Sequence, residues 1–380
     1  MSAQGKRIAI VFRGIGDIGG TNNTIADHAR HFTSRGHAVD LIGEKVHKGG
    51  VTPDMGRPVK ISRVPLLNRY KWRWFAARAD RAVAAGDYDF VAGHGHHLRQ
   101  HVVSMHNCLH LAHEIIHGSA LDARGGLAEI HDRMFAADRF GLCICNSRLM
   151  RTDLVDRYGV DAARLPVIYP GYRPAQFNRD DRARYRDTVR AELDCGDAVL
   201  IGLVTSGDYE KRGLDLLLEA YAGLDTDDRE RTLLLVLGKQ GGSGPFLDQA
   251  RALGVADRLR FVAHTREPQR YFHALDICVH PARIEEFGQS VQEAMACGVP
   301  VVTNRRVGAV ELLPQGLQND TPPVADAASI RAGLAGLIAS PQRRQALAEI
   351  GYAAVRDNTL QTNLERTLEV YARAGLDIAR

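Results

Sequence analysis

The chain has 380 residues, 45% of them hydrophobic and 25% charged, which is ordinary for a globular protein and enough for two or three domains. Its net charge of +4 is mildly basic and falls well short of a nucleic-acid-binding surface, so we expect no nucleic-acid partner. An excess of this size suits an anionic ligand or an anionic lipid surface equally well.

No apolar run is long enough to cross a membrane, and the five apolar residues at positions 8–12 are too few for the core of a signal peptide. The six cysteines contain no CxxC pair and mostly stand in apolar surroundings, a pattern typical of buried free thiols in a reducing compartment. We therefore expect a cytoplasmic protein.

Short β-branched runs alternate with helical patterns from end to end, which is typical of parallel sheets wound with helices. The expected strands of a first array are residues 8–12, 39–42, 59–64, 90–92, 102–105, 142–145 and 167–169. Two prolines around a glycine at 170–174 break the pattern, and a second array has expected strands at 200–204, 233–237, 259–262, 277–279 and 301–303. A helical pattern at 361–372 follows. Such arrays bind ligands at the carboxyl ends of their strands, so we expect the site in a cleft between the two halves.

The first expected strand is followed by a GxGxxG motif at residues 14–19. On its own this motif is compatible with a nicotinamide or flavin cofactor, with Asp40 or Glu44 as the acid that binds a ribose. In a dinucleotide site, however, the glycines open the helix, whereas here the helix is expected to begin nearer Thr24 than Gly16. An NAD-dependent oxidoreductase and a plain glycine turn both remain as alternatives.

A basic and aromatic segment at 69–75 holds both tryptophans of the chain. Such a helix can lie on an anionic membrane or form a core helix with a charged outer face. Farther along, residues 87–89 spell DxD, but they stand at the start of a strand and are interpreted as structural.

His113, Glu114 and His117 spell the zinc motif HExxH. On a helix both histidines share one face, with Glu114 as the base, and Glu129 is a conceivable third ligand. The longer metzincin pattern fails at Ala120, so a zinc hydrolase stays a minor alternative. We predict no required metal.

The loop that follows the first strand of the second array contains Lys211 and Arg212, directly before Gly213. A helix is expected to begin near Gly213. Two adjacent cations at such an entrance can hold an anionic ligand.

Residues 280–302 read HPARIEEFGQSVQEAMACGVPVV and carry the strongest signal in the chain. The pattern predicts a turn at 285–288 and a helix at 289–297, closed by Gly298 as a left-handed cap. The first N–H groups of that helix have no partner within it, so the turn favours an anion such as a phosphate. Glu285 and Glu293 flank the turn, and a carboxylate there suits sugar hydroxyls.

This string resembles the signature of the retaining glycosyltransferases of family 4, nucleotide-sugar enzymes with two facing Rossmann-like domains (GT-B type). Looser matches, such as Asn146 with Ser147, extend the resemblance over most of the chain. It implies an N-terminal domain at 1–172, a donor-binding domain at 173–358, and a C-terminal helix at 359–380 that crosses back to the first domain.

The resemblance also implies roles for individual residues. Glu293 would bind the nucleotide ribose, and Glu285 would lie near the donor sugar. Lys211 and Arg212 would bind the donor diphosphate, although arginine stands where the family usually has lysine, so each individual role stays open. The phosphate-binding turn would comprise four consecutive residues: Phe287, Gly288, Gln289 and Ser290.

From the first domain, His106 would lie beside the donor sugar, with His94 and His96 as weaker acceptor-side candidates. The pair Gly19 and Gly20 would form a flexible loop near the donor phosphate or the acceptor.

We therefore expect a retaining hexosyltransferase that needs no cofactor beyond its nucleotide-sugar co-substrate. The donor is predicted as UDP-glucose, with GDP-mannose as the alternative. The acceptor would be a glycan or a lipid-linked glycan in lipopolysaccharide or other cell-envelope polysaccharide synthesis. A peripheral position at the inner face of the plasma membrane stays open. A module that binds nucleotide without catalysis is a rival interpretation.

Overall fold

The computed structural model describes residues 5–16, 20–47, 49–63, 70–239 and 241–376. The chain folds into two compact units. Unit 1 comprises Met1–Tyr169 and Leu360–Arg380, and unit 2 comprises Pro170–Thr359. Two crossings therefore join the units, one after Tyr169 and one after Thr359.

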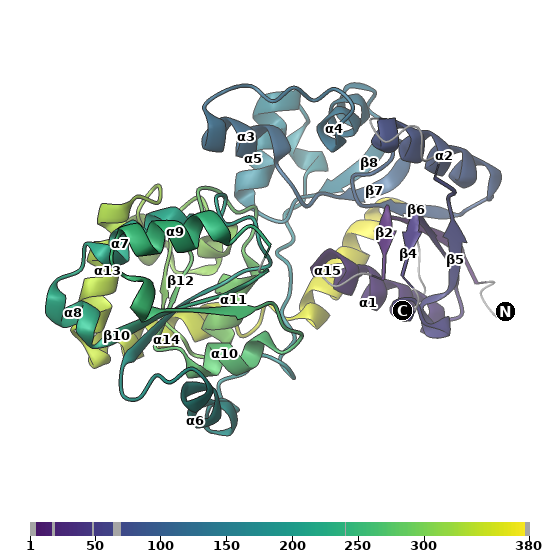
Figure 1. Cartoon of the computed structure of the whole chain (residues 1–380). Coiled ribbons are helices and arrows are strands. Elements are labelled where there is room, and N and C mark those ends of the chain that lie inside the picture. Colours follow the sequence, from purple (N-terminus) through teal and green to yellow (C-terminus); the bar gives the residue numbers. More distant parts are fainter. Residues whose placement is uncertain (1–4, 17–19, 48, 64–69, 240, 377–380) are drawn as a thin grey trace. The chain divides into compact units, whose positions relative to one another are not determined.

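A six-stranded parallel sheet of order β5-β3-β1-β6-β7-β8 forms the centre of unit 1 (Figure 1). Its strands are β1 (Arg7–Val11), β3 (Ala38–Gly43), β5 (Arg57–Lys60), β6 (Phe90–Gly93), β7 (Gln100–Ser104) and β8 (Phe140–Ile144), and β2 (Gly14–Ile15) pairs separately with β4 (Lys45–Val46). The helices are α1 (Gly20–Ser34), η1 (Pro53–Met55), α2 (Lys71–Ala85), α3 (Leu109–His117), α4 (Leu127–Ala136), α5 (Arg148–Tyr158), η3 (Ala162–Arg164) and α15 (Leu360–Arg373).

Unit 2 is built around a five-stranded parallel sheet of order β11-β10-β9-β12-β13. Its strands are β9 (Val199–Val204), β10 (Thr232–Gly238), β11 (Leu259–Ala263), β12 (Ile277–Val279) and β13 (Val301–Val302). The helices are α6 (Arg182–Glu192), α7 (Leu214–Ala222), α8 (Thr226–Glu230), α9 (Gly244–Ala252), η4 (Ala256–Arg258), α10 (Pro268–Ala274), α11 (Gln289–Ala296), η5 (Gly308–Leu312), α12 (Gln315–Asp320), α13 (Ala327–Ile338) and α14 (Pro341–Val355).

The central strands are apolar because helices cover both faces of each sheet. Every residue of β6 and of β10 is buried. Such continuous hydrophobic runs are what a doubly covered parallel sheet requires. The expectation of two α/β units with parallel sheets is confirmed.

Two expectations about strand bounds are wrong. Residues 167–169 form no strand, and only Val167 makes an isolated bridge, to Cys145. Prolines at 166 and 170 flank this stretch, and a proline has no N–H to donate to a ladder. The strand expected at 59–64 is displaced to Arg57–Lys60, with residue 64 outside the described residues. The first helix is described from Gly20, midway between Gly16 and Thr24, and residues 17–19 before it lie outside the described residues.

The C-terminal helix α15 packs in unit 1, as expected. Tyr371 is 1% exposed and its ring lies near those of Phe32 and Phe90, at centroid distances of 6.2 and 4.9 Å. The end of the chain therefore contributes to the core formed by its beginning (Figure 1). None of the helices among the described residues is both long and apolar enough to span a bilayer.

In each sheet the chain adds strands first on one side of its first strand and then on the other. The place of this reversal indicates where a ligand binds. In unit 2 the chain builds β9, β10 and β11 toward one side, then returns to add β12 and β13 on the other side of β9. Ligands of open α/β sheets bind beside the carboxyl ends of the two strands at such a switch point. In unit 2 these are the ends of β9 and β12.

Candidate active site

Two loops of unit 2 follow β9 and β12, at residues 205–213 and 280–288. The first loop ends at Gly213, whose φ of +68° is in the left-handed region. A Cβ at Gly213 would lie 2.1 Å from the carbonyl oxygen of Pro281, so only glycine allows the two loops to approach this closely.

Arg283 fastens the first loop to the second. Its backbone N–H donates to the Lys211 carbonyl at 2.9 Å, and its Nη1 donates to the Glu210 carbonyl at 2.6 Å. The same guanidinium forms a bidentate ion pair with Asp215, at 2.8 and 2.5 Å. The position of the cationic loop is therefore fixed by its backbone as well as by its side chains.

The two cations of this loop pair with two consecutive glutamates. The Lys211 ammonium donates to both carboxylate oxygens of Glu286, at 3.0 and 2.8 Å. Arg212 Nη1 lies 2.5 Å from Glu285 Oε2. All four side chains are at most 16% exposed, so solvent screens these pairs little. Lys211, Arg212 and Glu285, expected at one site from the sequence, do lie together.

The pKa values of Glu285 and Glu293 are shifted in opposite directions. Burial acts to raise the pKa of Glu285, but Arg212, His280 and Lys211 outweigh it and lower this pKa to about 2. Burial raises the pKa of Glu293 to about 8, with Arg173 opposing the shift. Glu285 is therefore a fixed anion at neutral pH, while Glu293 can take up or release a proton there.

The helix after the turn begins as the sequence predicts. Gly288 has a φ of +93°, and α11 starts at the next residue, Gln289. Two backbone contacts fix the turn: Glu285 forms a β-bridge with Val307, and the Ala309 N–H donates to the Phe287 carbonyl at 2.6 Å. The first N–H groups of a helix have no carbonyl partner within it, so those of Gln289 and Ser290 suit an anion.

In unit 1, histidines gather at the carboxyl ends of β6 and β7: His94 and His96 are buried, and His106 is half-buried. His94 Nδ1 lies 2.9 Å from His106 Nε2, and the two rings stack at a centroid distance of 5.2 Å. His96 stacks on Phe12 at 4.5 Å and accepts from the Arg13 N–H. Burial lowers the pKa of His106 to about 4, so the ring is neutral at pH 7. It can then accept or donate one hydrogen bond but carries no charge.

The glycine motif at residues 14–19 is described only in part, because residues 17–19 lie outside the described residues. Gly14 belongs to β2, and the described part of α1 starts at Gly20. The two acids that could bind a ribose are engaged: Asp40 with Arg57 and the Tyr88 hydroxyl, and Glu44 with Arg13. Among the described residues, the oxidoreductase alternative therefore lacks a free acid for the ribose.

The HExxH stretch lies on α3, and its two histidines do share a face, with ring centroids 4.5 Å apart. Glu114, however, forms a bidentate ion pair with Arg157, at 2.9 and 2.8 Å. Within the described residues no cluster of three or more His, Cys, Asp or Glu side chains could hold a metal ion. Glu129, the conceivable third ligand, instead pairs with Arg73 at 2.6 Å. The zinc-hydrolase alternative thus has neither a free base nor a ligand set.

Both tryptophans of the segment around α2 have partners within unit 1. The Arg13 guanidinium lies over the ring of Trp72, with its carbon 4.7 Å from the ring centroid. The Trp74 Nε1–H donates to the Ser62 carbonyl. They point to different partners, as expected for residues two apart on a helix. Residue 69 lies outside the described residues.

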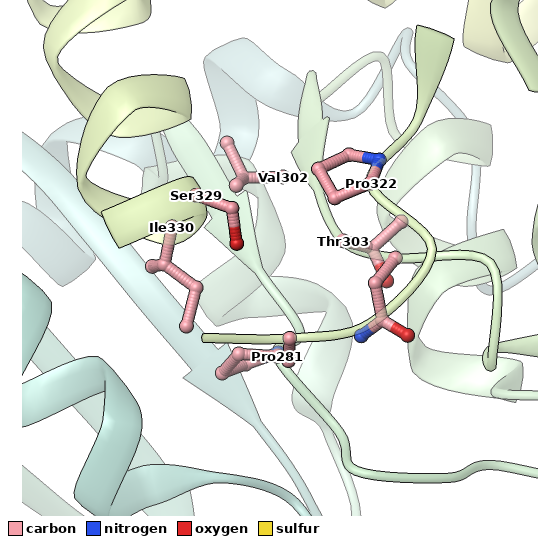
Figure 2. A pocket seen from close by; sticks show the side chains of 8 residues that line it. Pro281, Val302, Thr303, Pro322, Ser329 and Ile330 are labelled. Carbon is pink, nitrogen blue, oxygen red and sulfur yellow. The ribbon is translucent and has the colours of Figure 1, made fainter. Parts of the chain in front are cut away.

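A small hollow behind the second loop of unit 2 has a structural role (Figure 2). Its polar groups are already used, because the Thr303 hydroxyl donates to the His280 carbonyl at 2.9 Å and the Ser329 hydroxyl to the Asp326 carbonyl at 3.1 Å. None of the expected site residues lines this hollow, which is bordered by Pro281, Val302, Thr303, Asn304, Pro322, Ala325, Ser329 and Ile330.

Sequence reasoning missed three residues that build the cationic site. Glu286 holds Lys211, Arg283 fastens the loop, and buried His280 places Nε2 3.6 Å from Glu285. For Glu286 the sequence does contain an indication, because this acidic residue directly follows Glu285 in the predicted turn.

Comparison with known proteins relates both units to glycosyltransferases. Residues 18–176 match the model of Glycosyltransferase Family 4, and residues 197–354 match that of Glycosyl transferases group 1. The chain is 30% identical to the D-inositol 3-phosphate glycosyltransferase of Geodermatophilus obscurus, over 88% of this chain and 82% of that protein. It is also 30% identical to D-inositol 3-phosphate glycosyltransferase 2 of Catenulispora acidiphila, where the match spans only 58% of the relative.

Solved structures share the fold over nearly the whole chain. WaaG, a glycosyltransferase involved in lipopolysaccharide biosynthesis, superposes with a TM-score of 0.81, covering 96% of this chain and 99% of its own, at 18% identity. Anabaena Alr3699/HepE in complex with UDP-glucose gives a TM-score of 0.75 at 18% identity, covering 97% of this chain and all of its own. At such identities these likenesses show the fold alone.

The two parallel-sheet units and the family matches define a glycosyltransferase of the GT-B type. The chain belongs to glycosyltransferase family 4, the family that its 280–302 segment resembles. The sequence-based identification of the family is thereby confirmed.

Proposed function

We propose that this protein is a retaining glycosyltransferase that binds a nucleoside diphosphate sugar in unit 2 and transfers a hexose to a hydroxyl acceptor. The observation that carries the proposal is the cation pair Lys211 and Arg212 at the switch point of the unit 2 sheet. The start of α11 directly follows the second loop at the same switch point. Arg283 and the two glutamates fasten this second loop to the cationic loop. Fixed cations and helix N–H groups are the chemistry that a diphosphate leaving group needs.

In this proposal the acceptor hydroxyl attacks the anomeric carbon from the side on which the diphosphate leaves. The bond from the anomeric carbon to the phosphate oxygen breaks as the new glycosidic bond forms. The departing phosphate oxygen takes the proton of the acceptor, and Lys211 with Arg212 stabilises its negative charge. Glu293 binds the ribose, Glu285 contacts the donor sugar, and the turn at 287–290 holds the phosphates.

The donor-sugar face is completed by His106 of unit 1, with Gly19 and Gly20 near the donor phosphate or the acceptor. Because these residues belong to a different unit from the cations, closure of the two units is part of the proposed cycle. The domain limits of the sequence analysis, 1–172, 173–358 and 359–380, stay a proposal for the functional division of the chain.

UDP-glucose is the first donor to test, because HepE has been solved with it, and GDP-mannose is the alternative. For the acceptor, the relatives support D-inositol 3-phosphate, while the name of WaaG supports a glycan of lipopolysaccharide. Peripheral membrane contact through α2 is a further proposal, supported by exposed Arg73, whose guanidinium lies 5.6 Å from the ring centroid of Tyr70, and by the 42% exposure of Tyr70.

The function is tested by incubating the protein with UDP-glucose or GDP-mannose and measuring release of the free nucleoside diphosphate, with and without each acceptor. We expect release from one donor, at least 10-fold faster with one acceptor, and a product that retains the anomeric configuration by NMR. Donor that binds without any release of diphosphate would favour a non-catalytic module. Reduction of NAD with no nucleotide-sugar turnover would overturn the proposal.

The raised pKa of Glu293 predicts that UDP affinity depends on pH. Ribose hydroxyls donate most effectively to an ionised carboxylate, and this group ionises as the pH rises through about 8. We expect the Kd for UDP, measured by calorimetry, to fall several-fold between pH 6.5 and pH 8.5. In Glu293→Gln the affinity should be weaker and should change much less over this range, because only the last ionisation of the diphosphate itself remains. An equal pH dependence in both proteins would contradict the assignment of the ribose to Glu293.

A further inference from the structure

Glu286, which directly follows the predicted sugar-contacting residue Glu285, has no role in the proposed mechanism. Glu286 is 4% exposed, and both of its oxygens lie within 3.0 Å of Lys211 Nζ. A carboxylate this deeply buried needs a cation, and a lysine side chain this constrained has lost most of its rotamers before any ligand arrives.

We propose that Glu286 is a positioning residue, which holds the Lys211 ammonium in the place where it meets the donor diphosphate. The inference rests on the proposed function and adds to it the residue that sets the geometry of one phosphate contact. Glu286 does not touch the donor in this account and acts only through Lys211.

The backbone geometry supports a permanent pair. Arg283 fastens the carbonyl of Lys211 to the second loop at 2.9 Å, and the Glu285 N–H donates to the Arg306 carbonyl at 2.9 Å. Backbone hydrogen bonds therefore fix the chain at or next to both partners of the ion pair, so the pair is not a chance contact of two mobile side chains. Glu285 and Glu286 divide the two cations between them, one each.

The number of donors shows how Lys211 can serve Glu286 and a phosphate together. An ammonium has three N–H groups, and the two oxygens of Glu286 account for two of them. The third can reach a phosphate without breaking the pair. If Lys211 left Glu286 altogether, a buried carboxylate would stay without its cation, which opposes binding. Preorganisation of this kind improves affinity because the side chain is ordered before the ligand binds.

The test measures the Kd for UDP and for inorganic pyrophosphate, together with donor KM and kcat, in a double-mutant cycle. The variants are Glu286→Gln, Lys211→Met and the double variant, which removes both charges and leaves no unpaired buried ion. Glu210→Gln is the matched control, since its side chain is exposed in the same loop.

We expect Glu286→Gln to weaken UDP and pyrophosphate binding about 10-fold, and to raise KM more than it lowers kcat. In the Lys211→Met background the same change should cause no further loss of affinity, because the group through which Glu286 acts is gone, and removing the unpaired carboxylate should leave Kd unchanged or lower it. Glu210→Gln should leave all constants unchanged. Thermal unfolding without ligand checks that each variant is folded, and the comparison of Lys211→Met with the double variant stands even if Glu286→Gln alone does not fold.

Two results would overturn the inference. Tighter binding of UDP by Glu286→Gln would make Glu286 a competitor of the diphosphate, and an equal loss in both backgrounds would show an action independent of Lys211. Wild-type protein that binds neither UDP, GDP nor pyrophosphate would instead contradict the proposed function.

Discussion

Replacing Arg212 with alanine is expected to reduce kcat for sugar transfer by about 100- to 1,000-fold, the usual cost of losing one group that stabilises developing charge. In the proposed mechanism the guanidinium stabilises the departing phosphate, so its contribution is largest in the transition state. The same change leaves Glu285, whose side chain is 12% exposed, without its nearest cation. We therefore also expect the free energy of unfolding to fall by roughly 3 kcal/mol.

Steady-state kinetics and denaturant unfolding measure the two effects separately. Arg212→Lys keeps the charge but loses the planar fork, and should lose about 10-fold in kcat. Arg184→Ala is the control, because Arg184 is an exposed cation on α6 of the same unit. Transfer by Arg212→Ala at the wild-type rate would remove Arg212 from the mechanism.

Mild acid is expected to unfold unit 1, because this unit buries several neutral histidines. Burial lowers the pKa of His28, His97, His106 and His131 to about 4, whereas an unfolded chain has histidines near 6.5. The folded state thus binds fewer protons than the unfolded state between these values. Stability is complete above pH 6.5 and falls below it, by on the order of 1 kcal/mol per histidine per pH unit.

Tryptophan fluorescence follows this transition selectively, because both tryptophans of the chain lie in unit 1. We expect a cooperative transition near pH 5. His97→Leu should move its midpoint about half a pH unit lower, since His97 is fully buried and neither ring nitrogen has a hydrogen-bond partner among the described residues. His117→Ala, an exposed histidine, should leave the midpoint unchanged. Fluorescence constant down to pH 4 would contradict the account.

The fold could be predicted from the sequence because its signals are local. Alternating apolar strands, and glycines whose backbone requires positive φ, such as Gly213 and Gly288, fix the order of elements and the turn before α11. The expected strand at 167–169 failed because the flanking prolines, which lack an N–H, outweigh its β-branched residues.

The pairing of charges could not be predicted in the same way, because it depends on distances between remote parts of the chain. Lys211 and Glu286 are 75 residues apart in sequence yet share two hydrogen bonds. For the same reason the HExxH motif misleads: Arg157, 43 residues away, occupies its glutamate. A sequence motif names residue types, whereas the fold decides which of them remain available to a ligand.

The most direct test of the central claim is hydrogen–deuterium exchange of the whole protein with saturating UDP and, separately, with NAD. We predict that UDP slows amide exchange in residues 207–214 and 285–292 of unit 2, where the cationic loop and the start of α11 lie. NAD should change nothing. Protection by NAD at residues 13–24, with no effect of UDP on unit 2, would contradict the assignment of the site and of the function that rests on it.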